Sequence, residues 1–377
     1  MLLNEDQEAI RDMARDFAKR RLVPHAAEWE RQGAVDEETL RAMGRLGFFG
    51  MLAPPAYGGA GVDLLTYVVA LEEIAAGSGA LSTVMSVTNS PVVAAILEYG
   101  SAAQKTRFMP RLAQGEMIGA FSLTEPGAGS DAANIKTRAV REGDGWRITG
   151  TKQFVTSGRI AGVALVFAIS DRAAGKRGMT CFMVPTDTPG YTVAKIERKL
   201  GQHASDTCQI HLDVHIPDEL RLGPEGAGYR IALANLETGR IAIGAQAVGM
   251  ARAAFEAASV YAQEREAFGT QIVNHQAVAF RLADMATRIE AARQLVWHAA
   301  TLKMAGRPAM REASMAKLFA SEIAEKVASD AIQIHGGYGY LSDFPVERIY
   351  RDVRICQIYE GTSDIQRMVI SRNLMGA

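Results

Sequence analysis

The chain has 377 residues, of which 48% are hydrophobic and 22% are charged, and its formal net charge is -1. At roughly 100 to 200 residues per domain, this length predicts two or three domains with ample core. The apolar content excludes a disordered chain, and the balanced charge excludes a general polyanion binder. Nucleic acid is therefore not expected as a partner.

The three cysteines, Cys181, Cys208 and Cys356, are scattered and form no CxxC pair. This spacing indicates neither a disulfide framework nor a zinc cluster, and it favours a reducing compartment. No apolar run is expected to reach membrane-spanning length, and the N-terminal MLLNEDQEAIRDMARDF is amphipathic and acidic rather than signal-like. We therefore expect a soluble protein, cytoplasmic if it is bacterial.

The first third of the chain has a helical pattern from Asn4 to about Ile118. Asn4 followed by Gln7 predicts a helix cap, and LLTYVVALEEIA and SPVVAAILEYG carry apolar faces with few breakers. We predict an all-α domain over residues 1–118.

The period changes between about Ala120 and Pro224. The segments WRITG, LVFAIS, CFMV, YTVAKIE and CQIHLDVHI are short and β-branched, and turn clusters separate them. They predict a middle β domain over residues 119–225. His211, Asp213 and His215 would share one face of the last strand, but alternation alone explains them, and without an HExxH pattern a solvated face is favoured over a metal site.

The helical pattern returns over 227–263, 271–305 and 309–334, and two shorter helices follow. We predict a helical domain over residues 226–377. The expected fold is therefore mainly α with a central β domain.

The stretch FSLTEPGAGSD holds Gly127, Gly129 and Ala132 at the spacing of a dinucleotide fingerprint. Its context argues against a Rossmann unit, because NIKTRAVREGDGWRITG predicts a hairpin with a GDG turn rather than a helix. A glycine-rich loop between strands can still present N–H groups to an anion or to ring carbonyls. A plain tight connection is the alternative.

Three segments of the last third have both a structural and a functional interpretation. Glu237 and Arg240 are three residues apart, which fits an exposed ion pair or, beside Gly239, an arginine anchor for a ligand. EREAFG fits a helix end capped by Gly269, and His335 fits a core histidine before a glycine turn. In QIYEGTSDIQ, Ser363 and Gln366 have the spacing of a capping box, which leaves Glu360 and Gly361 unexplained.

Taken together and in this order, TEPGAGSD, FVTSG, ASDTC, EREAFGT, HQAV, QIHGGYG, FPVERIYRD and IYEGTSDIQR resemble signature segments of the acyl-CoA dehydrogenase family. The resemblance covers essentially the whole chain and is strongest to short-chain and short branched-chain members. It implies an N-terminal helical domain, a β-barrel-like middle domain and a C-terminal four-helix bundle. It also implies FAD, an acyl-CoA substrate, an electron-transferring flavoprotein as partner, a role in fatty acid metabolism, and a homotetramer or dimer.

The resemblance gives Glu360 a catalytic role. A base must remove the α-proton of the acyl thioester while a hydride leaves the β-carbon for flavin N5, and a carboxylate suffices if burial raises its pKa. Gly361 would let the thioester pass close to the backbone.

The remaining site residues are likewise implied by the resemblance. The cofactor contacts are Phe121, Leu123, Thr124, Gly129, Ser130, Phe154, Val155, Thr156, Arg265, Phe268, Gln276, Gln333, Gly336, Gly337, Thr362 and Asp364. Those from Arg265 to Gly337 are expected to reach FAD largely from the neighbouring subunit. The substrate contacts are Ser130, Glu237, Arg240 and Gly361.

The chain departs from the family pattern at three positions. Phe154 stands where many relatives have Trp, His203 replaces a common Arg, and Gly239 occupies the place where some branched-chain relatives carry their base. Two alternatives to a dehydrogenase stay open: a flavin oxidase that uses O₂ directly, and a non-catalytic flavin- or acyl-CoA-binding scaffold.

Overall fold

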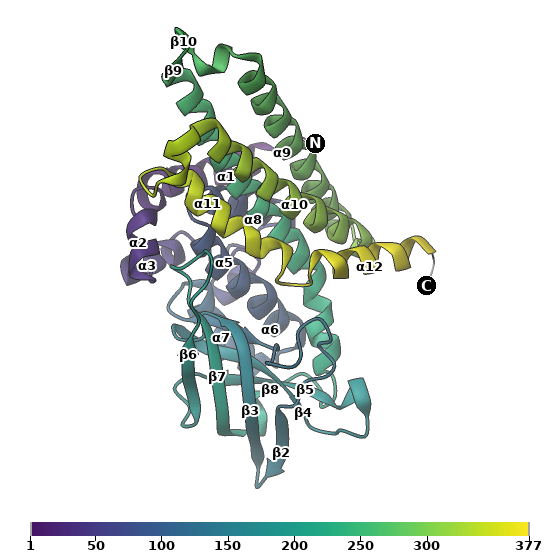
Figure 1. The fold of residues 1–377 in the computed structure, drawn as a ribbon. Coiled ribbons are helices and arrows are strands. Elements are labelled where there is room, and N and C mark those ends of the chain that lie inside the picture. Colours follow the sequence, from purple (N-terminus) through teal and green to yellow (C-terminus); the bar gives the residue numbers. More distant parts are fainter. Residues whose placement is uncertain (1, 376–377) are drawn as a thin grey trace.

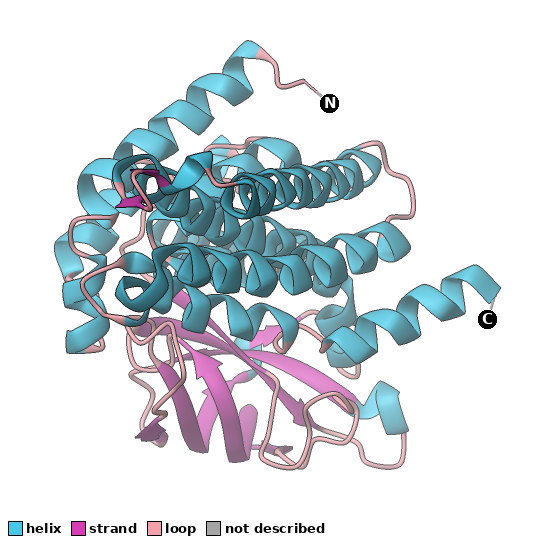
Figure 2. Ribbon diagram, turned by 45° about the horizontal axis from the view of Figure 1, so that its top comes forward, coloured by secondary structure: helices cyan, strands magenta, loops and turns pink. Residues whose placement is uncertain are grey.

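A computed structural model describes residues 2–375. Residue 1 and residues 376–377, which end the two predicted terminal domains, lie outside the described residues. Most helices of both chain ends lie together in the upper part of Figure 1, and the strands of the main sheet form a separate layer below them (Figures 1 and 2). The predicted order of helical, β and helical parts is confirmed, whereas the boundaries after residues 118 and 225 stay predictions.

The α-helices account for most of the fold. They are α1 (Glu5–Phe17), α2 (Ala26–Gln32), α3 (Glu37–Arg45), α4 (Leu64–Gly77), α5 (Gly79–Val87), α6 (Ala94–Tyr99), α7 (Ala102–Ala113), α8 (Gly228–Glu264), α9 (Gln276–Met304), α10 (Met310–His335), α11 (Pro345–Val353) and α12 (Ser363–Met375). Asn4 and Gln7 form the predicted capping box at α1, because each side chain accepts from the other residue's backbone N–H.

Eight strands make one mixed sheet. They are β1 (Ile118–Ser122), β2 (Arg138–Glu142), β3 (Gly145–Thr156), β4 (Ala161–Ile169), β5 (Met179–Pro185), β6 (Tyr191–Ile196), β7 (Thr207–Pro217) and β8 (Arg221–Leu222). The order is β6-β7-β3-β2-β4-β5-β8, and β1 pairs parallel with β4. Glu142 pairs with Gly145, so β2 and β3 form the predicted hairpin.

The segment after α8 differs from the prediction. Residues 266–271 form a small hairpin of β9 (Glu266–Ala267) and β10 (Thr270–Gln271) instead of a plain helix end, and α9 begins only at Gln276. The two turn residues, Phe268 and Gly269, have φ values of 55° and 79°. Two consecutive positive φ values are typical of a type I′ hairpin turn, so Gly269 is a turn residue and not a helix cap.

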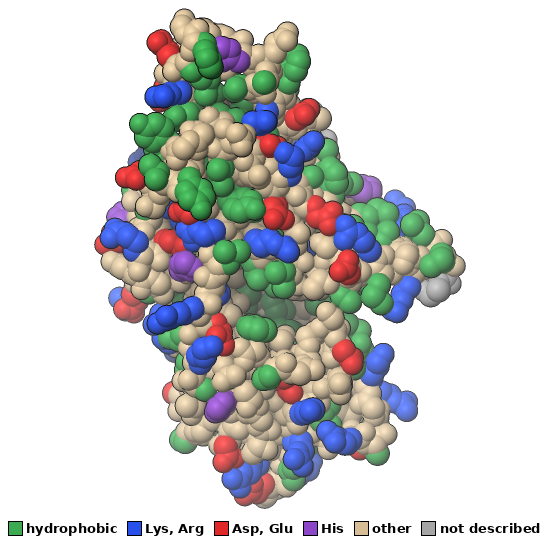
Figure 3. Space-filling model, viewed as in Figure 1, with side chains coloured by type: hydrophobic (Ala, Val, Ile, Leu, Met, Phe, Trp, Pro, Cys, Tyr) green, Lys and Arg blue, Asp and Glu red, His purple; other side chains and the backbone are tan. Residues whose placement is uncertain are grey.

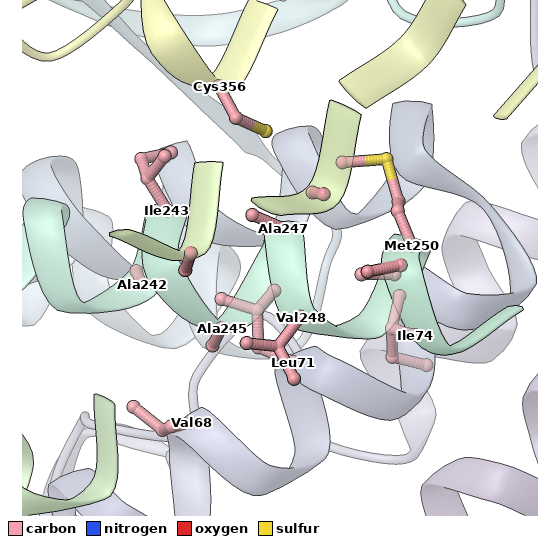
Figure 4. Packing of buried hydrophobic residues seen from close by; sticks show 14 of the residues in the cluster. Val68, Leu71, Ile74, Ala242, Ile243, Ala245, Ala247, Val248, Met250 and Cys356 are labelled. Carbon is pink, nitrogen blue, oxygen red and sulfur yellow. The ribbon is translucent and has the colours of Figure 1, made fainter. Parts of the chain in front are cut away.

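The helical core is centred on the packing of α4 against α8. Leu71 and Ile74 of α4 lie against Ala245 and Val248 of α8, and all four are almost completely buried (Figure 4). Glycines let α8 pack closely on both α4 and the sheet. A Cβ on Gly249 would overlap the backbone of Glu72 in α4, and one on Gly228 would lie 2.8 Å from the backbone of Thr180 in β5.

One described helical stretch, Gly79–Tyr99, has the length and mean hydropathy of a membrane-spanning helix. The expectation that no apolar run reaches this length is therefore wrong. Because 78% of its most apolar window is buried inside the fold, packing within the core accounts for the hydropathy.

We expect Leu71→Ala to lower the free energy of unfolding by about 2–5 kcal/mol, because the truncation leaves a cavity between α4 and α8. Chemical denaturation followed by circular dichroism measures the effect. Val140→Ala is the control, since Val140 is 60% exposed on β2 and its truncation changes stability by about 0.5 kcal/mol or less. Equal effects of the two substitutions would contradict the packing described for α4.

Candidate active site

The predicted base lies in a sharp turn between α11 and α12. The backbone φ is 53° at Glu360 and 96° at Gly361, so two consecutive residues have positive φ. Gln366 Nε2 donates to the carbonyl oxygen of Gly361 at 2.8 Å and to that of Glu360 at 3.3 Å. A φ of 96° is a conformation that residues with a side chain rarely adopt, so a glycine is favoured at position 361.

The predicted capping box between Ser363 and Gln366 is wrong. Thr362 is the capping residue, because its Oγ1 accepts from the N–H of Ile365 at 3.4 Å. The Ser363 hydroxyl has no hydrogen-bond partner among residues 2–375, and Gln366 turns back to the carbonyls of the preceding turn. Asp364 is exposed in the first turn of α12, where a carboxylate is favoured by the helix dipole.

The Glu360 carboxylate points inward onto helix α8. A Cβ on Gly239 would lie 2.8 Å from the carboxyl carbon of Glu360 and closer still to Oε2. The missing side chain of Gly239 therefore makes room for a protein carboxylate, where the sequence had indicated room for a ligand. Oε2 is buried and accepts no hydrogen bond from any described residue. Burial raises the pKa of Glu360 to about 7, although the nearby cations Lys317 and Arg240 lower it.

Glu237 and Arg240 do not form the predicted ion pair within the described chain. The Glu237 carboxylate accepts from Lys303 Nζ at 3.1 Å and from the N–H of Ala309 at 2.9 Å. The Arg240 guanidinium is 4% exposed and donates to Ser314 Oγ at 3.2 Å. Burial lowers the pKa of Arg240, and its Nε has no partner among the described groups. Arg240 therefore carries a buried charge toward Glu360.

The glycine-rich loop after β1 is anchored by one buried ion pair. Lys152 Nζ donates to Glu125 Oε1 at 2.9 Å and to the carbonyl of Leu123 at 3.0 Å, and the Glu125 carboxylate also accepts from the N–H groups of residues 136 and 137. Glu125 and Ala128 exchange backbone hydrogen bonds. Beyond this turn, Gly129 and Ser130 are exposed, and a Cβ on Gly129 would meet no atom within 4 Å. The loop thus presents a firmly held, open backbone edge.

Two further groups of predicted cofactor residues lie beside this loop. Phe121 is half-buried in β1 against Phe167, and the Thr124 carbonyl accepts from the N–H of Gln153. The pairing of β3 with β7 slips between Lys152 and Val155, and Phe154 lies in this irregularity with a φ of 57° and an exposed fraction of 64%. Val155 is buried and Thr156 is half-buried. The strand irregularity therefore turns an aromatic ring out of the sheet.

The remaining predicted cofactor residues lie at the opposite end of the molecule. The β9–β10 hairpin is at the top of Figure 1, and the sheet is at the bottom. Arg265, Gly336 and Gly337 line a cavity of about 430 Å³, while Gln276 and Gln333 are exposed and Phe268 is 98% exposed. A single copy of the chain does not bring these residues to the glycine-rich loop.

Other candidate features carry less chemistry. His211, Asp213 and His215 lie on the exposed face of β7 as predicted, and no cluster of three or more potential metal ligands occurs within residues 2–375. His335 is a core histidine stacked on Tyr261, as predicted. A cavity of about 1080 Å³ beside α3 and the start of β1 contains none of the predicted site residues.

Figure 3 shows the surface recessed where the β layer meets the helices, with hydrophobic side chains gathered there. A flavin fits these observations, because the open backbone edge at Gly129 and the outward ring of Phe154 can face a planar cofactor. The cavity beside Arg265 and Gly336 suits a second, phosphate-bearing part of such a molecule.

A largely buried carboxylate whose pKa is raised to about 7 is chemically suited to accept a proton, and here it lies in a three-part α, β, α fold. The family models "Acyl-CoA dehydrogenase, N-terminal domain", "middle domain" and "C-terminal domain" match residues 4–116, 120–214 and 226–375. The chain belongs to the acyl-CoA dehydrogenase family and is an oxidoreductase that acts on acyl-CoA.

Individual relatives agree over almost the full length. The mitochondrial short-chain specific acyl-CoA dehydrogenase of Rattus norvegicus is 45% identical over 99% of this chain and 91% of its own. Butyryl-CoA dehydrogenase from Megasphaera elsdenii is 40% identical, with a TM-score of 0.97 over 100% of this chain and 99% of its own. A chain solved in work on the electron transferring flavoprotein of Acidaminococcus fermentans is 43% identical, with a TM-score of 0.98 over 100% of both chains.

Sequence reasoning missed Lys317 of α10. Its side chain is completely buried, and Nζ donates to the carbonyl of Gly361 at 2.6 Å. The available signal was a single cation at an inward position of the apolar stretch SMAKLFAS. A buried lysine requires a partner, so this position pointed to an unidentified acceptor.

We expect Gly239→Ala to reduce acyl-CoA dehydrogenation by about 100-fold or more, because the new methyl group displaces the Glu360 carboxylate and small displacements of catalytic groups are costly. Turnover of butyryl-CoA with an artificial electron acceptor measures the loss. Thermal unfolding provides the control, since alanine favours a helix over glycine by about 1 kcal/mol. A fully active variant would show that Glu360 does not need this space.

Proposed function

We propose that this protein is an FAD-dependent acyl-CoA dehydrogenase in which Glu360 removes the α-proton of the acyl thioester. The observation that carries the proposal is the Glu360 carboxylate, buried on Gly239 without a hydrogen bond to its Oε2 from the described chain. An unpaired buried carboxylate is costly, and catalytic bases are a common reason for such an arrangement.

The chemistry follows from the carboxylate's surroundings. A pKa near 7 makes Glu360 a stronger base than an exposed glutamate while leaving much of it ionised at neutral pH. The α C–H bond breaks as an O–H bond forms on the carboxylate, and the two electrons of the β C–H bond leave as a hydride. Gly361 follows the base directly, so the thioester can lie against the backbone there.

The cofactor assignment deepens this proposal. FAD, when bound, supplies the acceptor of the β-hydride. Residues Phe121, Leu123, Thr124, Gly129, Ser130, Phe154, Val155 and Thr156 would hold its ring system. Arg265, Phe268, Gln276, Gln333, Gly336 and Gly337, with Thr362 and Asp364, would hold its other end. Ser130, Glu237 and Arg240 would contact the acyl-CoA.

The two separated sets of residues support an assembly of at least two subunits, and we propose a homotetramer or dimer in which one chain completes the cofactor site of another. Phe268 at the hairpin tip supports this, because an apolar ring exposed to 98% is well suited to burial by a partner.

An electron-transferring flavoprotein is the proposed acceptor of the electrons, and a short-chain acyl-CoA the proposed substrate, with fatty acid β-oxidation as the pathway. The chain solved in work on an electron transferring flavoprotein and the short-chain specific relative support these assignments. The cysteines are free and buried, which supports a reducing compartment such as the bacterial cytoplasm.

We expect anaerobic butyryl-CoA to bleach the flavin absorbance of the wild-type protein, and Glu360→Gln to abolish the bleaching while FAD stays bound. The amide occupies the same space but cannot accept the proton.

The wild-type bleaching rate rises with pH through a midpoint near 7, because only the ionised carboxylate is a base and burial raises its pKa to about 7.

Glu219→Gln is the matched control, because the Glu219 side chain is 72% exposed beside β8. It retains wild-type bleaching. If Glu360→Gln still bleaches, Glu360 is not the base that removes the α-proton. Peroxide formed in step with enoyl product, with no other acceptor present, would identify an oxidase, and flavin that stays oxidised across a wide acyl-CoA panel would identify a scaffold.

The shared site predicts complementation between two inactive variants. Arg265→Ala loses FAD, and Glu360→Gln loses the base, so each is inactive alone. If Arg265 serves the partner's site, a mixed assembly contains some sites with neither defect. Random pairing restores about a quarter of the sites. Activity measured after the variants are unfolded and refolded together tests this, and refolding each variant alone is the control. No recovery from a verified mixed assembly would place both residues in one chain's site.

A further inference from the structure

The turn that carries Glu360 is held by a residue outside the assigned site. Lys317 lies on α10, and its side chain is completely buried. Its Nζ donates to the carbonyl oxygen of Gly361 at 2.6 Å, the one hydrogen bond described for this ammonium. The same oxygen accepts from Gln366 Nε2 at 2.8 Å. The carbonyl is therefore fixed from α10 on one side and from α12 on the other.

This bond acts on an unusual backbone. Positive φ is rare for a residue with a side chain and costs free energy, so the conformation of Glu360 depends on contacts outside the turn. Gly361 tolerates its own positive φ, but its carbonyl direction is free until a donor fixes it. Lys317 supplies a charged donor, which makes a stronger hydrogen bond than a neutral one.

The same ammonium acts on the carboxylate through charge. Lys317 and Arg240 are the two cations that oppose the effect of burial on Glu360, and Lys317 is the larger contributor. The hydroxyl and thiol groups buried beside the turn are neutral near pH 7. Burial raises the pKa of the Tyr67 and Tyr359 hydroxyls and raises that of the Cys356 thiol to about 12. The Glu237 carboxylate accepts hydrogen bonds from Lys303 Nζ and from the N–H of Ala309.

Resting on the proposed function of Glu360, we propose that Lys317 is a positioning residue for the reaction. Its ammonium holds the Glu360–Gly361 turn and keeps the adjoining carboxylate in the charged form that accepts the α-proton. The role uses the charge and the donor of one side chain, so substitutions that separate the two properties can test it.

The test is the pH dependence of anaerobic flavin bleaching by butyryl-CoA. Lys317→Gln keeps a donor but removes the charge, and we expect its midpoint to move to higher pH by about one to three units, because the charge of Lys317 favours the ionised form of Glu360. Lys317→Arg keeps charge and donor and stays near the wild-type midpoint. Lys326→Gln is the matched control, because Lys326 lies on the exposed side of α10 and pairs with Asp330.

A purely structural role changes FAD content or thermal stability but not the midpoint. An unchanged midpoint in folded, FAD-bound Lys317→Gln overturns the proposal. If Lys317→Gln does not fold, Lys317→Met is the second charge-free variant, because Met leaves no polar group buried on α10. The proposal requires the bleaching midpoint of Lys317→Met to move to higher pH by the same amount. If Glu360→Gln still bleaches, the proposed base itself is wrong, whereas an inactive Glu360→Gln with an unshifted Lys317 variant rejects only this inference.

Discussion

The close approach of a carboxylate to a helix backbone governs the architecture of this site. Glu360 can reach α8 only because position 239 has no Cβ, and its carboxylate loses water on the way. Burial of a lone carboxylate is unfavourable, and the guanidinium of Arg240 and the ammonium of Lys317 offset part of that cost from two different helices. The site is therefore built from one partly buried anion and two buried cations.

This arrangement also explains the local backbone. The chain enters α12 through two residues with positive φ, which sets Thr362 rather than Ser363 at the capping position. Gln366 donates to the carbonyl oxygens of the turn, so its side chain does not take part in a capping box. The turn at Glu360 and Gly361 thus overrides the local capping preference of the sequence around it.

The sequence predicted the features that depend on near neighbours. Hydrophobic period identified the helices and strands, and the capping box of Asn4 and Gln7 formed because both members belong to one turn. Predictions failed where a distant partner intervened, because Arg240 turns inward to α10 and the Glu237 carboxylate accepts from Lys303. The capping box at Ser363 failed for a local reason, because Gln366 donates to the carbonyls of the turn that precedes α12. Lys317 escaped notice because its acceptor, the Gly361 carbonyl, lies 44 residues further along the chain. Only the family resemblance gave Glu360 a proposed role, because periodicity alone left this residue unexplained.

Helix α8 has a mechanical consequence for the whole molecule. Its 37 residues correspond to a rod of about 55 Å, and it touches the β layer at Gly228, the Glu360 carboxylate at Gly239 and helix α4 at Gly249. At Gly228 and Gly249 the opposing atoms belong to the backbone, so α8 cannot move closer to the sheet or to α4 without steric overlap. At Gly239 the opposing atoms are the end of a side chain, which can move. The two backbone contacts join the sheet to the bundle, and they favour ligand entry and exit by movement of loops and side chains over hinge bending between lobes.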